Sequence, residues 1–116
     1  MIVDHIPPID ISVAELNALL RNTDKPVLAY IWAPWCQPCK TMTPEIARAA
    51  GELANRVVVV KLNAVTETQA LTPFNLAAVP VLILFSKDGQ ERARTMKTLL
   101  AHQIVKWVLE GDSEPG

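Results

Sequence analysis

Cysteine and histidine are scarce in this sequence, and their scarcity excludes several kinds of protein. The 116 residues include only two cysteines and two histidines. Two cysteines are too few for the disulfide framework of a small secreted domain. Cys36 and Cys39 also stand only three positions apart, where a bridge would restrain little of the unfolded chain. A purely structural disulfide is therefore a poor explanation for this pair.

Long apolar runs and blocks of one charge are also missing. With 11 basic and 12 acidic residues, the chain carries no electrostatic footprint for nucleic acid or for an anionic membrane. The apolar runs at residues 27–32, 57–60 and 79–85 are much shorter than the roughly 20 residues that cross a bilayer. Prolines and aspartates interrupt the first ten residues, unlike a signal peptide. We therefore expect a cytoplasmic protein, unless a leader was removed from a longer chain.

The composition is that of one globular domain. Half of the residues are hydrophobic and a fifth are charged, which is typical of a chain with a single core. No internal repeat, low-complexity tract or linker interrupts the sequence. We predict a single domain over residues 1–116, in which residues 111–116 form a frayed polar tail.

Helical and strand patterns along the chain predict an α/β fold. Ser12 and Glu15 form a capping box that begins a helix reaching about Arg21. Apolar runs at residues 27–32, 56–62 and 81–85 predict strands, the first of them covered on both faces. Residues 66–75 have the composition of a short helix or an irregular crossover. The result is a mixed central sheet with helices on both faces.

The second half of the chain adds a hairpin and a last helix. Asp88 and Gly89 form a strong hairpin signal, so the following strand should pair antiparallel. Thr98 can cap the last helix. One face of that helix would present the apolar residues Leu100, Ile104, Trp107 and Val108.

The two cysteines stand where a buried strand gives way to a helix. Cys36 at the helix N-terminus would feel the positive end of the helix dipole and free N–H groups, which favour the thiolate. Helical residues three apart have Cβ atoms about 5–6 Å apart, whereas a disulfide needs about 3.5–4.5 Å. A cap position outside the regular helix lets the pair close. We predict that Cys36 is the exposed attacking thiol and that Cys39 resolves the mixed disulfide.

Residues 32–40, together with Pro44 and Pro80, resemble the thioredoxin family. The likeness runs from Pro26 to the last helix, Pro44 matching a proline inside the family's active-site helix and Pro80 its cis-proline. The resemblance implies a thioredoxin fold and a reversible dithiol exchange with the disulfides of other proteins. It implies no bound cofactor, and thioredoxin reductase as the partner that supplies electrons.

The resemblance also implies a docking surface for substrate proteins. The residue before the cis-proline, here Val79, would offer its backbone to the substrate peptide. The surface corresponds by position to Trp35, Gln37, Pro38, Ala64, Val79, Pro80 and Met96.

Three residues depart from the family pattern. Gln37 replaces a glycine between the cysteines, where residues tune the reduction potential. Tyr30 replaces a buried aspartate that assists proton transfer to the resolving cysteine, and a tyrosine with an ordinary pKa of about 10 is a poor acceptor. Lys61 matches the family's neighbouring lysine, so Lys61 and Tyr30 are the candidates for supporting proton transfer. Because Tyr30 is a poor proton acceptor, we expect Cys39 to resolve the mixed disulfide slowly. Lys97 replaces a glycine and should restrict the docking of partner proteins. Partners with acidic residues around their disulfide should still be able to dock.

Other roles compete with redox exchange as explanations for the two cysteines. They could be inert thiols, although a helix start is an unusual place for them. A zinc site needs about four ligands, and His5 and His102 lie near opposite ends of the chain. Two protomers could share a metal or an iron–sulfur cluster. We predict no metal and a monomer.

Two further functions stay open. The chain could be an adaptor or folding helper that binds partners with little redox turnover. It could also be an oxidase or isomerase of an exported compartment. Cys36→Ser separates an enzyme from an adaptor, because only the enzyme would lose its function.

Overall fold

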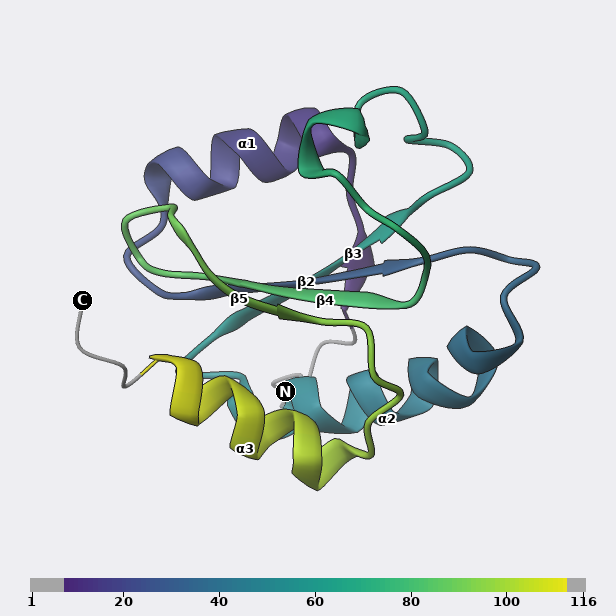
Figure 1. Cartoon of the computed structure of the whole chain (residues 1–116). Coiled ribbons are helices and arrows are strands. Elements are labelled where there is room, and N and C mark those ends of the chain that lie inside the picture. Colours follow the sequence, from purple (N-terminus) through teal and green to yellow (C-terminus); the bar gives the residue numbers. More distant parts are fainter. Residues whose placement is uncertain (1–7, 113–116) are drawn as a thin grey trace, which may run out of the picture.

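A central five-stranded sheet lies between two layers of helices in the computed structural model, which describes residues 8–112 (Figure 1). The strand order is β1-β3-β2-β4-β5. β3 pairs parallel with both β1 and β2, whereas β4 pairs antiparallel with β2 and β5. This confirms the predicted mixed sheet. The strands are β1 (Ile9–Asp10), β2 (Val27–Trp32), β3 (Val58–Asn63), β4 (Val81–Phe85) and β5 (Glu91–Thr95).

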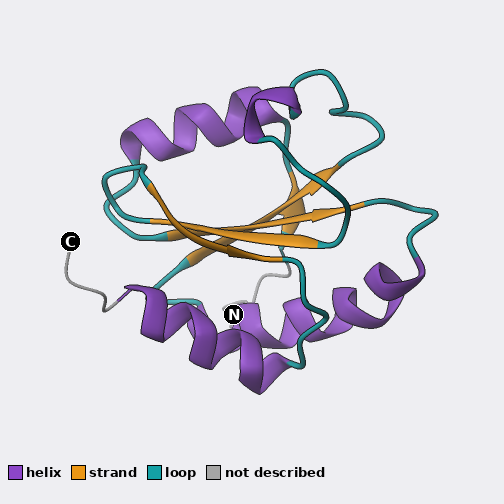
Figure 2. Cartoon of the chain, viewed as in Figure 1, coloured by secondary structure: helices purple, strands orange, loops and turns teal. Residues whose placement is uncertain are grey.

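Helices cover both faces of the sheet, as predicted. Helix α1 (Val13–Asn22) lies on one face, and α2 (Gln37–Leu53) and α3 (Ala101–Asp112) lie on the other (Figure 2). Each face has its own apolar core, because alternate residues of the buried strands point to opposite sides. In β2, Leu28 and Tyr30 face α2 and α3, while Val27, Ala29 and Ile31 face α1. Burial on both faces explains the unbroken apolar run in this strand.

The predicted capping box begins α1, and a distant side chain reinforces it. The Ser12 hydroxyl accepts from the Glu15 N–H at 3.0 Å, and the Glu15 carboxylate accepts from the Ser12 N–H at 2.8 Å. Glu67, in the connection after β3, accepts from the Val13 N–H at 2.8 Å. This connection is irregular and contains a short 3₁₀ turn, η1 (Thr72–Phe74). The contact from Glu67 fixes the connection to α1.

The prediction that Thr98 caps the last helix is wrong, because α3 begins at Ala101. Leu100 takes the cap position, since its carbonyl accepts from the Ile104 N–H at 2.9 Å. Leucine has no capping group, so other side chains satisfy the free donors: Gln103 accepts from the Leu100 N–H, and Glu45 of α2 accepts from the Ala101 N–H, both at 2.8 Å. The hydrogen bond from the Ala101 N–H lowers the pKa of Glu45, and the hydrogen bond from Arg48 lowers it further by a smaller amount.

The ends of the other elements also differ from the sequence prediction. Leu100 is 49% exposed and does not join the apolar face of α3, whereas Ile104 and Val108 are buried. Helix α3 includes Gly111 and Asp112, which were expected in the tail, and residues 113–116 of that predicted tail lie outside the described residues. β3 starts at Val58 rather than at residue 56. Among residues 8–112, no helix has the length and apolar character of a membrane span.

The predicted hairpin between β4 and β5 turns at Gly89. Its φ is +83°, and a Cβ there would lie 2.9 Å from the carbonyl oxygen of Leu20 in α1. Since a side chain is strained in this conformation and the contact is with backbone, Gly89→Ala should lower the free energy of unfolding by about 1–2 kcal/mol. Denaturant unfolding followed by circular dichroism measures it.

Gly111→Ala is the matched control for this prediction. A Cβ at Gly111 would meet side-chain atoms and no backbone, the end of the Leu84 side chain at 2.8 Å and the Ala93 Cβ at 4.0 Å, and this glycine lies inside a helix. Because alanine is the better helix former, this variant should lose much less stability than Gly89→Ala. Equal losses for the two variants would contradict the role assigned to the left-handed turn.

Candidate active site

The cysteine pair lies at the junction of β2 and α2. Cys36 is the N-cap residue of α2, with extended backbone angles (φ −82°, ψ 113°), and Cys39 belongs to the first turn of the helix. A disulfide joins the two residues, whose Cα atoms are 5.2 Å apart. The backbone N–H of Cys39 donates to the Cys36 sulfur at 3.2 Å. The structure therefore confirms that Cys36 sits at the cap, just outside the regular helix.

Both cysteines are buried in this disulfide form. Cys36 is 3% exposed and Cys39 is 1% exposed. They form a small cluster with Ala33, against which Trp32, Ala64 and Val79 pack. The prediction of an exposed Cys36 is therefore wrong for this form, because Ala64 and Val79, from two other loops, pack against the cysteine cluster.

The register of the sheet brings distant segments beside the cysteines. Ile31 near the end of β2 pairs with Val81 at the start of β4, and Leu82 pairs with Thr95 at the end of β5. The residues that precede β4 and follow β5 therefore lie at the edge where β2 leads into Cys36 (Figure 1). We call this the cysteine edge. Its members are Trp35, Gln37, Pro38, Ala64, Val65, Val79, Pro80, Met96 and Lys97.

The cysteine edge combines exposed apolar groups with a buried proline. Trp35 is 69% exposed, Met96 53% and Val65 50%. Pro80 is buried, Val79 is half-buried, and the peptide bond between them is cis, as the resemblance implied. Val65 was missed from the sequence. Its position after Ala64, whose N–H donates to the Trp32 carbonyl at 2.7 Å, places it here.

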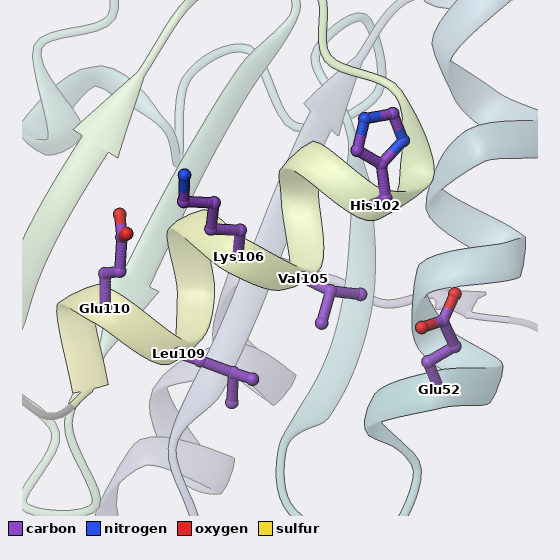
Figure 3. Close-up of a pocket in the computed structure, with 6 residues that line it drawn as sticks. All are labelled: Glu52, His102, Val105, Lys106, Leu109 and Glu110. Carbon is purple, nitrogen blue, oxygen red and sulfur yellow. The ribbon is translucent and has the colours of Figure 1, made fainter.

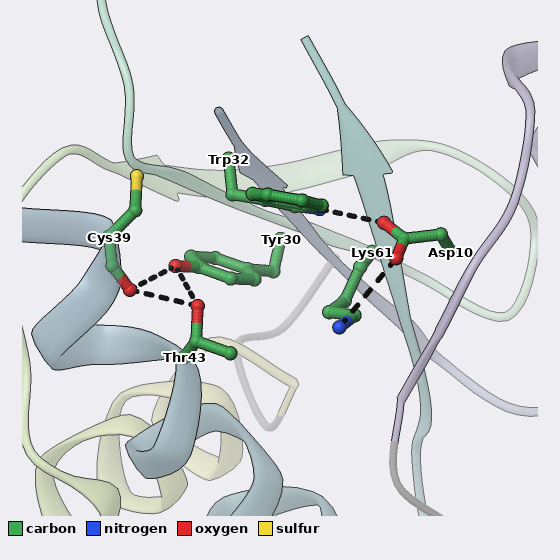
Figure 4. Close-up of polar contacts among 6 residues, drawn as sticks. All are labelled: Asp10, Tyr30, Trp32, Cys39, Thr43 and Lys61. Atoms are coloured by element: carbon green, nitrogen blue, oxygen red, sulfur yellow. Dashed lines mark hydrogen bonds and ion pairs between the residues drawn. The ribbon is translucent and has the colours of Figure 1, made fainter. Parts of the chain in front are cut away.

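Tyr30 lies beneath the first turn of α2 (Figure 4). Its hydroxyl is 3.2 Å from the Cys39 carbonyl oxygen and 3.1 Å from the Thr43 hydroxyl, which itself donates to that carbonyl at 2.8 Å. The side chain is completely buried. Burial raises the pKa of Tyr30 above its ordinary value of 10.0, although the bond with Thr43 opposes the shift. The phenol is therefore neutral at physiological pH and joins α2 to β2.

Comparison with known proteins identifies the family. The family model for thioredoxin matches residues 8–110, and thioredoxin 1 of Chlorobaculum tepidum is 35% identical over 95 residues, 82% of this chain and 93% of the relative. The chain belongs to the thioredoxin family. Thioredoxin of Haemophilus influenzae is 37% identical over 100 residues, 84% of this chain and 91% of that protein. The crystal structure of chloroplastic thioredoxin z superposes with a TM-score of 0.83, at 26% identity, over 96% of this chain and 97% of that one.

Family membership and the cysteine disulfide together establish the chemistry. A chain of the thioredoxin family with a bonded Cys36–Cys39 pair is a thiol–disulfide oxidoreductase that acts on protein disulfides. The fold predicted from the sequence is likewise confirmed.

The chain also carries a polar cluster that the sequence did not reveal. Asp10 in β1 accepts from the indole N–H of Trp32 at 2.7 Å, and its second carboxylate oxygen lies 3.7 Å from the Lys61 ammonium (Figure 4). The same ammonium is 5.7 Å from the centroid of the Trp32 ring. β1 has only two residues, too few for a periodic pattern. The alternation of Ile9, Asp10 and Ile11 was the one local signal for it.

A second contact missed from the sequence supports the loop before the cis-proline. Arg94 of β5 donates to the Phe74 carbonyl at 2.8 Å and pairs with Glu91 at 2.6 Å. Phe74 ends η1, and Asn75 follows in the left-handed conformation with φ +56°. The start of the loop that leads to Val79 is thus tied to β5.

An open pocket lies between α2 and α3 (Figure 3). It lies away from the cysteines. Glu52 on its rim is 16 residues along α2 from Cys36, roughly 24 Å at the helical rise. Its lining mixes both charges with two apolar side chains. The residues are Glu52, His102, Val105, Lys106, Leu109 and Glu110.

Proposed function

We propose that Cys36 is the attacking thiolate and Cys39 the resolving thiol in the reduction of protein disulfides. The Cys36 thiolate attacks one sulfur of the substrate disulfide, forms a mixed disulfide and releases the first substrate thiolate. Cys39 then loses its proton and attacks the Cys36 sulfur. This forms the Cys36–Cys39 disulfide and releases the second substrate thiolate, so two electrons have passed to the substrate.

The contact from the Cys39 N–H to the Cys36 sulfur carries this assignment. It aims a backbone donor at the Cys36 sulfur, at the N-terminus of a 17-residue helix. A negative charge on that sulfur would gain the hydrogen bond and the favourable end of the helix dipole. Cys39 lies inside the first turn of the helix, and within residues 8–112 no backbone N–H donates to its sulfur. Cys36 is therefore the better thiolate of the two.

The cysteine edge is the surface proposed to receive the substrate protein. Its exposed apolar side chains, Trp35, Met96 and Val65, suit the desolvated centre of an interface. Val79, beside the cis-proline, would pair with an extended substrate segment through its backbone. Exposed Lys97 adds positive charge, which favours partners with acidic residues near the disulfide.

The setting that fits this chemistry is a reducing compartment. Dithiols are kept reduced in the cytoplasm, so we propose that the chain works there. We also propose that it works as a monomer. Thioredoxin reductase is the proposed source of electrons. In this role the domain of residues 1–116 acts alone and needs no bound cofactor or metal.

Insulin reduction tests the proposal together with the role of Lys97. The parent chain should accelerate the reduction of insulin by dithiothreitol. Lys97→Gly removes a long cationic side chain from the cysteine edge, so its turnover with thioredoxin reductase should rise roughly threefold or more. Turnover of a substrate with an acidic segment beside its disulfide should fall.

The matched control is Lys87→Gly. It removes the same charge from the hairpin that follows β4, and the end of β4 pairs with the start of β2, away from the cysteines. This variant should behave as the parent with every substrate. Equal rates for Lys97→Gly and the parent would refute the proposed restriction of docking.

A further inference from the structure

Asp10 connects the first strand to the tryptophan beside the cysteines. One carboxylate oxygen accepts from the Trp32 indole N–H at 2.7 Å, and the other pairs with the Lys61 ammonium at 3.7 Å. In the sheet, Lys61 pairs directly with both Asp10 and Tyr30. Three neighbouring strands, β1, β3 and β2, are therefore joined through one exposed carboxylate.

Trp32 is the member of this cluster that packs beside the cysteines. It is the last residue of β2, and its side chain packs against the cluster of Ala33, Cys36 and Cys39. The indole is only partly buried. Without a partner for its N–H, such a ring could turn between rotamers. The carboxylate of Asp10 selects one orientation, and the Lys61 ammonium lies over the ring.

We propose that Asp10 is a positioning residue for disulfide exchange. Its carboxylate fixes the orientation of the Trp32 indole beside the Cys36–Cys39 pair. The substrate disulfide packs against this ring and is oriented by it. The proposal rests on the exchange described above and adds a residue to it. The carboxylate acts through Trp32, because the contacts that define its place are with the indole and with Lys61, and Trp32 lies between it and Cys39 in Figure 4.

The two carboxylate contacts can be separated by substitution. Asp10→Asn keeps a side-chain oxygen for the indole N–H but removes the charge that faces Lys61. Asp10→Ala removes both contacts. Trp32→Phe keeps a ring beside the cysteines but has no N–H to donate. Asp24→Ala is the control, since Asp24 is an exposed aspartate in the turn before β2.

The experiment measures kcat/KM for insulin reduction and the change in tryptophan fluorescence between the disulfide and dithiol forms. Asp10→Ala should lower kcat/KM roughly three- to tenfold and alter the fluorescence change. Compared with Asp10→Ala, Asp10→Asn should recover most of the parent's kcat/KM and most of its fluorescence change. In the Trp32→Phe background, Asp10→Ala should add little further loss. Denaturant unfolding confirms that each variant is folded at the assay temperature.

Three results would overturn the proposal. The first is an Asp10→Ala variant with the parent's kinetics and fluorescence change. The second is an Asp10→Asn variant whose kcat/KM is as low as that of Asp10→Ala. The third is a Trp32→Phe chain in which Asp10→Ala lowers kcat/KM as much as it does in the parent. A parent chain that failed to reduce insulin would count against the function instead. The fluorescence change on chemical reduction would still test the position of the indole.

Discussion

Replacing Cys36 with serine is expected to abolish disulfide reduction, with a loss of at least about a thousandfold in insulin turnover. A serine hydroxyl is a far weaker nucleophile than a thiolate and cannot form the mixed disulfide. The exposed residues of the cysteine edge are unchanged in this variant, so partner binding should persist. Turbidity of reduced insulin measures turnover, and surface plasmon resonance measures binding to a captured partner.

Cys39→Ser is the matched variant, because it removes the other sulfur from the same helix turn. It should still attack a substrate disulfide but should accumulate the mixed disulfide, visible by mass spectrometry of the non-reduced sample. Trapping by Cys36→Ser instead would reverse the two proposed roles. If Cys36→Ser kept the full effect of the chain in cells, the adaptor function would account for it better than catalysis.

Turnover at neutral pH should increase roughly fivefold or more when Tyr30 is replaced by aspartate. The phenol of Tyr30 is neutral because burial raises its pKa, and its hydroxyl contacts the Cys39 carbonyl and Thr43. It therefore cannot take the proton from Cys39 as that residue resolves the mixed disulfide. A carboxylate in this place could act as a general base, an effect typically worth about a hundredfold or more when fully aligned. Stopped-flow measurement of the resolution step tests it.

The same substitution should cost stability. Tyr30 is among the largest of the fully buried side chains in the described residues. Aspartate would leave a cavity and bury a carboxyl group, which together should lower the free energy of unfolding by about 3–5 kcal/mol. Turnover must therefore be compared at a temperature where the variant is folded. A folded variant with an unchanged or lower rate would contradict the prediction.

Tyr30→Phe separates the hydroxyl from the ring. It preserves the packing beneath α2, and Thr43 can still donate to the Cys39 carbonyl. The resolution rate should match that of the parent, while the lost hydrogen bond should cost about 0.5–1.5 kcal/mol. A clear fall in the resolution rate would show that the Tyr30 hydroxyl takes part in proton transfer.

Local patterns predicted much of the fold because their physical causes lie within a few residues. The capping box of Ser12 and Glu15 spans three positions, and the hairpin depends on the left-handed conformation of one glycine. The cap position of Cys36 follows from its place before a helix. Each of these features was found where the sequence indicated it.

The errors at Thr98 and Cys36 concern contacts between residues far apart in the chain. Thr98 has a good capping side chain, but Glu45 reaches the Ala101 N–H from 56 residues away. The contact between Trp32 and Asp10, which are 22 residues apart, was likewise missed because no local pattern indicates it. Cys36 was expected to be exposed because its own segment suggested it, whereas Ala64 and Val79 cover it from other loops.

The sequence by itself determined the α/β class, the cysteine pair at a helix start, and the resemblance that the family comparison confirmed. These depend on residue types and short spacings, which the linear order contains. Only the tertiary structure decided which carboxylate faces Lys61, what covers Cys36, and that Asp10 contacts the tryptophan beside the cysteines. Those relations arise when the sheet sets β1, β3 and β2 side by side, and no short stretch of sequence encodes that register.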